Sequence, residues 1–282
     1  MANANVQTAN STSSGTQLTI SNFDVPAGNK SLIVVHITGS QSVTSVTYGG
    51  NALTEFLDQG SGGRRQFIYY RALGDLGATE TGNVVVNWSS NNAYRTIIAT
   101  SFQNVDQTTP MNNSNSATDN SFPTLTITSS SGDMAVDNVS GEVSGTPTFT
   151  VDASQTLSAC ATSDTGGATE RTICASYESS TGASVAMDWT EGGTYNRPAH
   201  LGGNIQSGGA LPVEFTDFKV HREDEHIKLY WQTASESNNK GFEVLRSNDF
   251  RNWESLGFVN GNGNTFVRQD YEFYDSKPLF GI

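Results

Sequence analysis

The chain has 282 residues, of which only 15% are charged, and its formal net charge is −13. This length is enough for one large domain or two ordinary domains, each with its own hydrophobic core. The acidic balance argues against nucleic acid as a partner, because phosphate binding needs clustered lysine and arginine. No apolar run approaches the roughly 18 residues that a membrane span requires. Because few residues are charged, the polarity of the chain comes mainly from Ser, Thr, Asn and Gly, as is common on secreted β proteins.

Residues 1–17 are polar and rich in Asn, Ser and Thr. With few apolar side chains, this segment is either disordered or a strand that needs a partner. As a donor strand, it could add to the sheet edge of another subunit. It has no apolar signal-peptide core, so we expect the numbering to describe a mature or recombinant form of an exported protein.

Residues 18–206 are expected to form one jelly-roll-like β-sandwich. Residues 31–38 are a nearly continuous run of apolar and β-branched side chains, which predicts a central strand. No window shows a helical stripe. The other predicted strands, bounded by Gly, Asn and Ser turns, are 43–48, 66–72, 83–88, 95–102, 124–128, 134–139, 146–151, 156–162, 171–177, 184–189 and 200–205.

The two cysteines, Cys160 and Cys174, lie in two of these strands, and residues 163–169 between them are rich in turn formers. A hairpin at that turn would place the cysteines on facing strands within bonding distance. We therefore expect a disulfide, which would imply an oxidising compartment. The alternative is a pair of free, buried thiols that pack as small hydrophobic groups.

The charge density changes near residue 210. Residues 1–210 carry 23 charged side chains, whereas residues 211–282 carry 20 in about a third of the length. The glycine-containing stretch 207–212 is read as a linker, and 213–282 as a second domain. There, Ile227, Leu229 and Trp231 alternate with polar residues, as an antiparallel sandwich requires.

Four blocks of the second domain carry a resemblance: LPVEFTDF at 211–218, IKLYWQTASESNN at 227–239, GFEVLRS at 241–247 and WESLGFV at 253–259. The domain resembles the fibronectin type III-like module found near the C-terminus of proteins exported by type IX secretion in Gram-negative bacteria. The resemblance implies an immunoglobulin-like or fibronectin III-like sandwich, export to the cell surface or medium, and a spacer role without catalysis.

Modules of this type usually continue past the strand at 271–275 into two further strands, and the sorting domain that normally follows is not present either. We therefore expect either a truncated sequence or an incomplete sandwich. An incomplete sandwich exposes core side chains and unpaired backbone groups. A strand from another chain could cover them, which keeps a filament hypothesis open.

The first domain resembles, more loosely, secreted bacterial sandwich domains of the lectin or jelly-roll kind. The blocks that carry this resemblance are VTYGGNALT at 46–54, FQNVDQTTP at 102–110 and ASVAMDW at 183–189. The resemblance implies a sandwich fold and export, and it does not identify a ligand.

The sequence contains no motif of a catalytic or metal site. The histidines, His36, His200, His221 and His226, form no short-spaced metal motif, and His36 reads as a satisfied histidine of an apolar strand. No nucleophile elbow, phosphate loop or His-Glu-x-x-His pattern occurs. We therefore expect no catalytic residue, no metal and no cofactor, although the scattered aspartates leave calcium open.

A sugar-binding surface needs exposed aromatic rings beside polar groups. Tyr94 and Tyr195 lie in loop-like segments next to Arg95 and Arg197, so these four residues are the candidate glycan contacts. Trp88 and Trp189 end strands and are read as core residues.

Three hypotheses follow. In the first, the chain is a non-enzymatic structural or adhesive protein of the bacterial cell surface, which self-associates, for example as the subunit of an extracellular filament assembled by strand sharing. In the second, it is a carbohydrate-binding module of a larger secreted protein. In the third, which we favour least, it is a secreted hydrolase, and this would need clustered acidic side chains in a cleft. The expected fold class is all-β, with two tandem antiparallel sandwiches.

Overall fold

The computed structural model describes residues 3–11, 15–60, 65–91, 95–118, 124–143, 148–163, 170–192, 196–208, 215–223, 225–234, 236–265 and 267–278. Within these ranges the chain forms antiparallel β-sheets and no helix, so the predicted all-β fold class is confirmed. Internal contacts divide the chain into two compact units, unit 1 (Met1–Gly209) and unit 2 (Ala210–Ile282). None of the described residues belongs to a helix that is long and apolar enough to cross a membrane.

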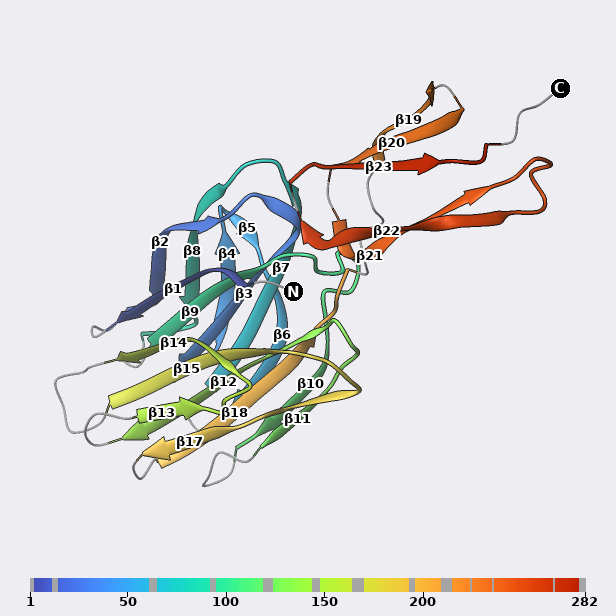
Figure 1. Cartoon of the computed structure of the whole chain (residues 1–282). Coiled ribbons are helices and arrows are strands. Elements are labelled where there is room, and N and C mark those ends of the chain that lie inside the picture. The colour runs from blue at the N-terminus through green and yellow to red at the C-terminus, as the bar shows by residue number, and fades with distance from the viewer. Residues whose placement is uncertain are drawn as a thin grey trace. The chain divides into compact units, whose positions relative to one another are not determined.

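The first part of unit 1 is a sandwich of two antiparallel sheets (Figure 1). Sheet I has the order β2-β8-β4-β5, with β2 at Gln17–Val25, β8 at Glu80–Trp88, β4 at Val43–Tyr48 and β5 at Asn51–Ala52. Sheet II has the order β1-β9-β3-β7-β6, with β1 at Asn3–Ser11, β9 at Arg95–Phe102, β3 at Gly28–Gly39, β7 at Arg65–Leu76 and β6 at Thr54–Gly60. The core between the two sheets includes Phe23, Tyr48, Phe67 and Trp88.

The second part of unit 1 adds two more layers. Sheet III has the order β10-β18-β12-β15-β14, with β10 at Met111–Ala117, β18 at Asn196–Ile205, β12 at Met134–Val143, β15 at Glu170–Ser179 and β14 at Thr156–Ser163. One face of sheet III packs against sheet II. Two small two-stranded sheets cover the opposite face. One pairs β11 (Leu125–Thr128) with β16 (Ser184–Met187), and the other pairs β13 (Thr148–Val151) with β17 (Trp189–Gly192).

Strand β3 explains why the sheets stack. Its side chains alternate between two cores: Ile33, Val35 and Ile37 pack toward sheet I, whereas Leu32 and Val34 pack toward sheet III. A strand that is buried on both faces reads as a continuous apolar run. Unit 1 is therefore a stack of four layers, and not the single two-sheet sandwich expected over residues 18–206.

The predicted disulfide is confirmed. Cys160 of β14 and Cys174 of β15 are direct partners in the antiparallel ladder and are bonded to each other. The hairpin that the turn-rich segment predicts brings them together, although residues 164–169 lie outside the described part of the chain.

Part of the N-terminal segment is a strand. Asn3–Ser11 forms β1, which pairs antiparallel with β9 of its own chain. Over these residues the structure has the strand alternative, with a partner in the same chain. Exchange of this strand with another subunit remains a prediction.

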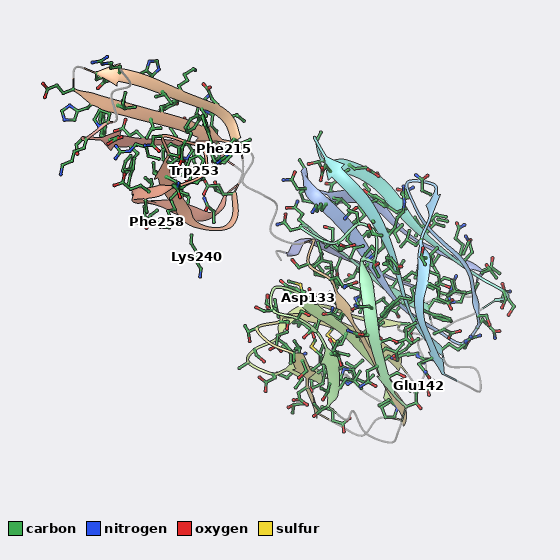
Figure 2. All side chains as sticks on the ribbon, turned by 90° about the vertical axis from the view of Figure 1, so that its right-hand side faces the viewer. Asp133, Glu142, Phe215, Lys240, Trp253 and Phe258 are labelled. Atoms are coloured by element: carbon green, nitrogen blue, oxygen red, sulfur yellow. A yellow bond between two sulfur atoms is a disulfide. The ribbon has the colours of Figure 1, made fainter. Side chains whose placement is uncertain are left out.

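Unit 2 contains a three-stranded sheet and a separate hairpin. Sheet IV has the order β19-β20-β23, with β19 at Phe215–Glu223, β20 at His226–Thr233 and β23 at Gln269–Asp275. The hairpin joins β21 (Glu236–Arg246) to β22 (Glu254–Thr265). Figure 2 shows the side chains of this unit, with Phe215, Trp253 and Phe258 labelled.

Candidate functional site

The residues predicted to contact a glycan do not form a described site. Tyr94 and Tyr195 lie outside the described residues, and of Arg197 only the backbone, in β18, is described. Arg95 is buried, with 2% of its surface exposed. Its guanidinium lies over the ring of Trp88, 5.3 Å from the centroid, and Nη1 donates a hydrogen bond to the carbonyl oxygen of Gln17. The interpretation of Arg95 as an exposed sugar contact is therefore corrected: it is a core residue of unit 1.

An aromatic platform is likewise missing from the described surface of unit 1. Trp88 and Trp189 are buried, as the sequence suggested. Every other aromatic side chain described in unit 1 is buried or half-buried. Sugar rings stack on exposed aromatic faces, so the described part of unit 1 offers no such surface.

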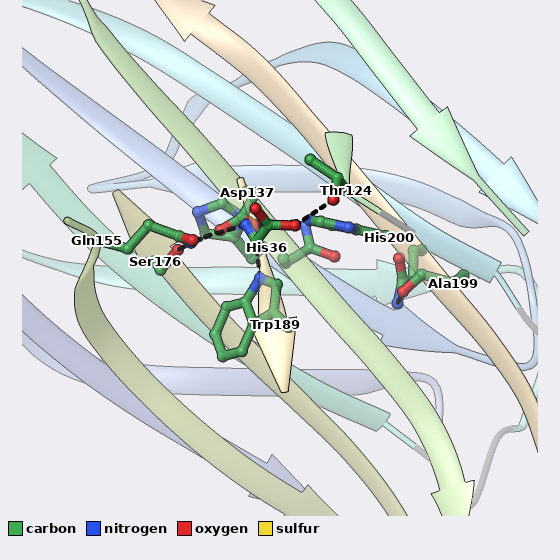
Figure 3. Close-up of polar contacts among 11 residues, drawn as sticks. His36, Thr124, Asp137, Gln155, Ser176, Trp189, Ala199 and His200 are labelled. Carbon is green, nitrogen blue, oxygen red and sulfur yellow. Dashed lines mark hydrogen bonds and ion pairs between the residues drawn. The ribbon is translucent and has the colours of Figure 1, made fainter. Parts of the chain in front are cut away.

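A buried polar network lies between sheet III and the layer that covers it (Figure 3). The carboxylate of Asp137 on β12 accepts hydrogen bonds from Trp189 Nε1, at 2.6 Å, and from the hydroxyl of Ser176. His200 Nε2 lies 2.7 Å from the same carboxylate. Gln155 Nε2 in turn donates to Ser176 Oγ at 2.8 Å.

This network resembles a catalytic arrangement only in its residue types. Asp137 and His200 have no exposed surface, so a substrate cannot reach them. The serine hydroxyl bonds to the carboxylate and not to the imidazole, so no base is positioned to activate it. The arrangement satisfies buried polar groups and therefore stabilises the fold.

His36 has the structural role that the sequence predicted. Its Nδ1 lies 3.0 Å from Nδ2 of Asn138. This hydrogen bond joins β3 of sheet II to β12 of sheet III. Burial lowers the pKa of His36 to about 4, with a smaller opposing effect from the charge of Asp137. Among the described residues, no group of three His, Cys, Asp or Glu side chains is placed to hold a metal ion.

A group of exposed apolar side chains lies in unit 2. Strand β19 is exposed along most of its length, and its apolar residues Phe215, Phe218 and Val220 are 53%, 58% and 54% exposed. Isolated exposed apolar side chains are common, but a contiguous group indicates an interaction surface.

These side chains border an open groove between sheet IV and the hairpin. One hollow of about 420 Å³ is lined by residues that include Val220, Leu229 and Leu245. A second hollow of about 190 Å³ is lined by residues that include Phe218, Leu229, Trp231 and Leu245. Because the two hollows share Leu229 and Leu245, we treat them as one apolar groove, defined by Phe218, Val220, Leu229, Trp231 and Leu245.

The groove is bordered by strand edges without partners. In the described part of unit 2, β21 pairs with β22 and with no other strand, and β19 pairs only with β20. Each strand therefore has a free edge of backbone N–H and C=O groups. Such an edge is a template for another strand.

Aromatic packing holds the floor of the groove in place. Trp231 on β20 is stacked on Tyr271 of β23, with ring centroids 5.6 Å apart. Phe242 on β21 packs against both rings, at 5.3 and 4.9 Å. These contacts dock the hairpin onto sheet IV. Phe215 of β19 also packs against Phe242, with ring centroids 5.7 Å apart, whereas Phe218 and Val220 stay more than half exposed.

Glu236 links the hairpin to sheet IV through hydrogen bonds. Its carboxylate is buried and accepts bonds from the hydroxyls of Tyr271 and Thr233, from Asn239 Nδ2 and from the backbone N–H of Asn262. Burial alone would raise the pKa of Glu236, but these hydrogen bonds outweigh it and lower the pKa. Arg246, the last residue of β21, forms ion pairs with Glu254 and Asp275, and these ion pairs raise the pKa of its guanidinium.

The described part of the chain is thus an all-β protein with an open, mainly apolar groove in unit 2. Besides its apolar residues, the lining of the two hollows includes charged and hydroxyl side chains, among them Glu243, Ser247 and Asp275. Searches against protein-family models, curated proteins and solved structures found no match to this chain.

Sequence reasoning found part of this site. The alternation of Ile227, Leu229 and Trp231 predicted a common apolar face, and all three line the groove. The buried network was not predicted, although a signal existed: Asp137 is the only charge in the apolar strand predicted at 134–139.

Proposed function

We propose that the chain is a secreted structural or adhesive protein of the bacterial cell surface that self-associates by sharing β-strands. The observation that carries this proposal is the apolar groove of unit 2, where β19 and β21 each have an edge that no other described strand covers. In the strand-addition mode of recognition, backbone hydrogen bonds provide affinity and pockets for alternate side chains provide specificity. The groove offers both kinds of contact to an extended segment.

The export part of the proposal has separate support. The Cys160–Cys174 disulfide is of a kind that persists in oxidising compartments and is rare in the cytosol. The resemblance of unit 2 to modules of type IX-secreted proteins points the same way. Both observations support the export part of the proposal.

Sedimentation of the purified full chain over a range of concentrations, followed by electron microscopy, tests the proposal. We expect concentration-dependent association. Phe218→Ser, at the groove, should weaken it by about tenfold, since a buried aromatic anchor contributes more than 1 kcal/mol to an interface. Lys219→Ser is the matched control on the neighbouring residue of the same strand, and association should persist in it.

Two outcomes would contradict the proposal. A chain that remains monomeric at all concentrations would remove the basis for self-association. A monomer that also binds glycans on an array would favour the alternative of a carbohydrate-binding module.

A further inference from the structure

Strand β9 has the composition of a central strand. All eight of its residues, Arg95–Phe102, are buried. Ile97 and Ala99 belong to the core between sheets I and II, whereas Ile98 packs on the other face with Ile173. A strand that is buried on both faces needs partners along both edges, because a bare edge of this kind templates aggregation.

The partner along one edge is β3, and the partner along the other is β1. The β1–β9 register runs without interruption from Asn5↔Ser101 to Ser11↔Arg95. The sequence of β1, NANVQTANS, has no charged residue and only one large apolar residue, Val6. Attachment of β1 therefore depends chiefly on the backbone ladder, and a backbone ladder is largely independent of side-chain identity.

Strand β1 is held in its sheet by a single strand pairing, and it also packs against β14 and β2. In the described part of the chain it pairs with β9 alone and ends the strand order of sheet II. It is followed by β2, which begins only six positions after Ser11 and belongs to sheet I. Removal of β1 from its place therefore breaks one strand pairing and leaves the other pairings of unit 1 intact.

We propose that β1 is an exchangeable strand, and that β9 of one copy accepts β1 of a second copy in the same antiparallel register. This inference rests on the proposed self-association and adds to the groove of unit 2 a second strand-sharing contact, in unit 1, whose donor is β1 and whose acceptor is β9. Exchange of an identical element recreates the contacts that it breaks, so its cost is low. Reciprocal exchange gives a closed dimer, and one-way exchange gives an open chain of subunits.

The apolar groove of unit 2 is a poor acceptor for this strand. The five residues that define the groove are aromatic or aliphatic, although Glu243 and Asp275 also line its hollows, whereas the sequence of β1 consists mainly of Asn, Gln, Thr and Ser. The burial of polar amides without partners is costly. The acceptor that matches β1 is thus β9.

A disulfide trap between register partners tests the proposal on the full chain. Val6 and Thr100 are direct partners across the β1–β9 pair, and cysteine is close in size to both side chains. One preparation carries Val6→Cys, and a second, of different mass through isotope labelling, carries Thr100→Cys. The two are mixed, oxidised, and analysed by mass spectrometry of the linked peptides.

The control replaces the acceptor by Thr44→Cys, because Thr44 is exposed on β4 of sheet I and away from β9. We expect the Val6→Cys and Thr100→Cys chains to form at least about ten times more mixed disulfide than the control pair, since docking in register raises the local concentration of the partner thiol. The mass of the products distinguishes closed dimers from longer chains.

The double variant, with both cysteines in one chain, completes the test. It should close within the chain when oxidised as a dilute monomer. It should then no longer exchange β1, so its association should fall relative to the wild-type chain. Closure within the chain together with only background mixed disulfide would overturn the proposal. Failure of both linkages would also overturn it, because the register would then be wrong.

These outcomes are separable from those of the proposed function. Sedimentation of the unmodified chain measures whether copies associate at all. If they associate while the trap gives background linkage, β1 exchange fails and self-association through another surface stands.

Discussion

His200 Nε2 lies 2.7 Å from Oδ2 of Asp137, and neither side chain has any exposed surface. The carboxylate also accepts hydrogen bonds from Trp189 and Ser176. Loss of one partner of a buried polar network leaves the others desolvated and unsatisfied. The network is therefore a structural centre for sheet III and for the layer that covers it.

Replacement of this carboxylate should destabilise unit 1 strongly. We expect Asp137→Ala to lower the free energy of unfolding by about 3 to 5 kcal/mol, because three buried donors lose their acceptor. Urea denaturation followed by tryptophan fluorescence measures the change. Glu191→Ala, at an exposed acid in β17, is the control and should change little; a similar small effect for Asp137→Ala would contradict the prediction.

The stability of unit 1 should decrease in mild acid because of His36. Its pKa is about 4 in the folded chain and near 6.5 in the unfolded chain, so the unfolded state binds the proton first. The contribution of neutral His36 to the free energy of unfolding is fully present above pH 6.5. It is lost as the pH drops toward 4, and the total loss is about 3 kcal/mol. Denaturation curves between pH 7.5 and 4 for wild type and His36→Gln should show a flatter profile for the variant, whereas exposed His226→Gln should keep the wild-type slope.

The disulfide should stabilise unit 1 through the loop that it closes. Cys160 and Cys174 are separated by 14 positions, and a loop of this size corresponds to about 3 kcal/mol. We expect the double variant Cys160→Ser, Cys174→Ser to lose roughly that amount in urea denaturation. The expectation fails if wild type and variant unfold at the same urea concentration under non-reducing conditions.

Glu236→Gln should loosen the hairpin of unit 2 from sheet IV. The amide can accept fewer of the four hydrogen bonds that converge on the carboxylate, so we expect a loss of about 2 kcal/mol in unit 2. Because the folded-state pKa of Glu236 is lowered, its contribution is present above the unfolded pKa and is lost as the pH falls through the folded value. Hydrogen exchange of β21 and β22 amides, with exposed Glu225→Gln as control, would detect the change; unaltered exchange would argue against it.

Local sequence patterns predicted the strands better than their arrangement. The apolar run at 31–38 identified β3 and its central position, and the two cysteine-containing strands identified a hairpin. The polar strand β10, Met111–Ala117, has no apolar alternation, and its formation depends on pairing with β18. Pairing of this kind joins residues far apart in the chain, which a local pattern does not encode.

The same distinction applies to the sites. Alternation along β20 predicted the apolar face of the groove, since side chains of one strand divide between two faces by position alone. The network around Asp137 combines residues from β12, β15, β17 and β18 with Gln155. Its assembly depends on strand order, and therefore it was not predictable from spacing.

Sheet II contributes side chains to two cores at once, with Ile33 in one and Leu32 in the other. An amino-acid change in β3 therefore alters the packing of both halves of unit 1. Unfolding of either half would expose one buried face of the shared sheet to water. In the described part of unit 1, the shared sheet leaves no boundary at which one half could unfold alone. Calorimetry should record its melting as one cooperative event despite its four layers.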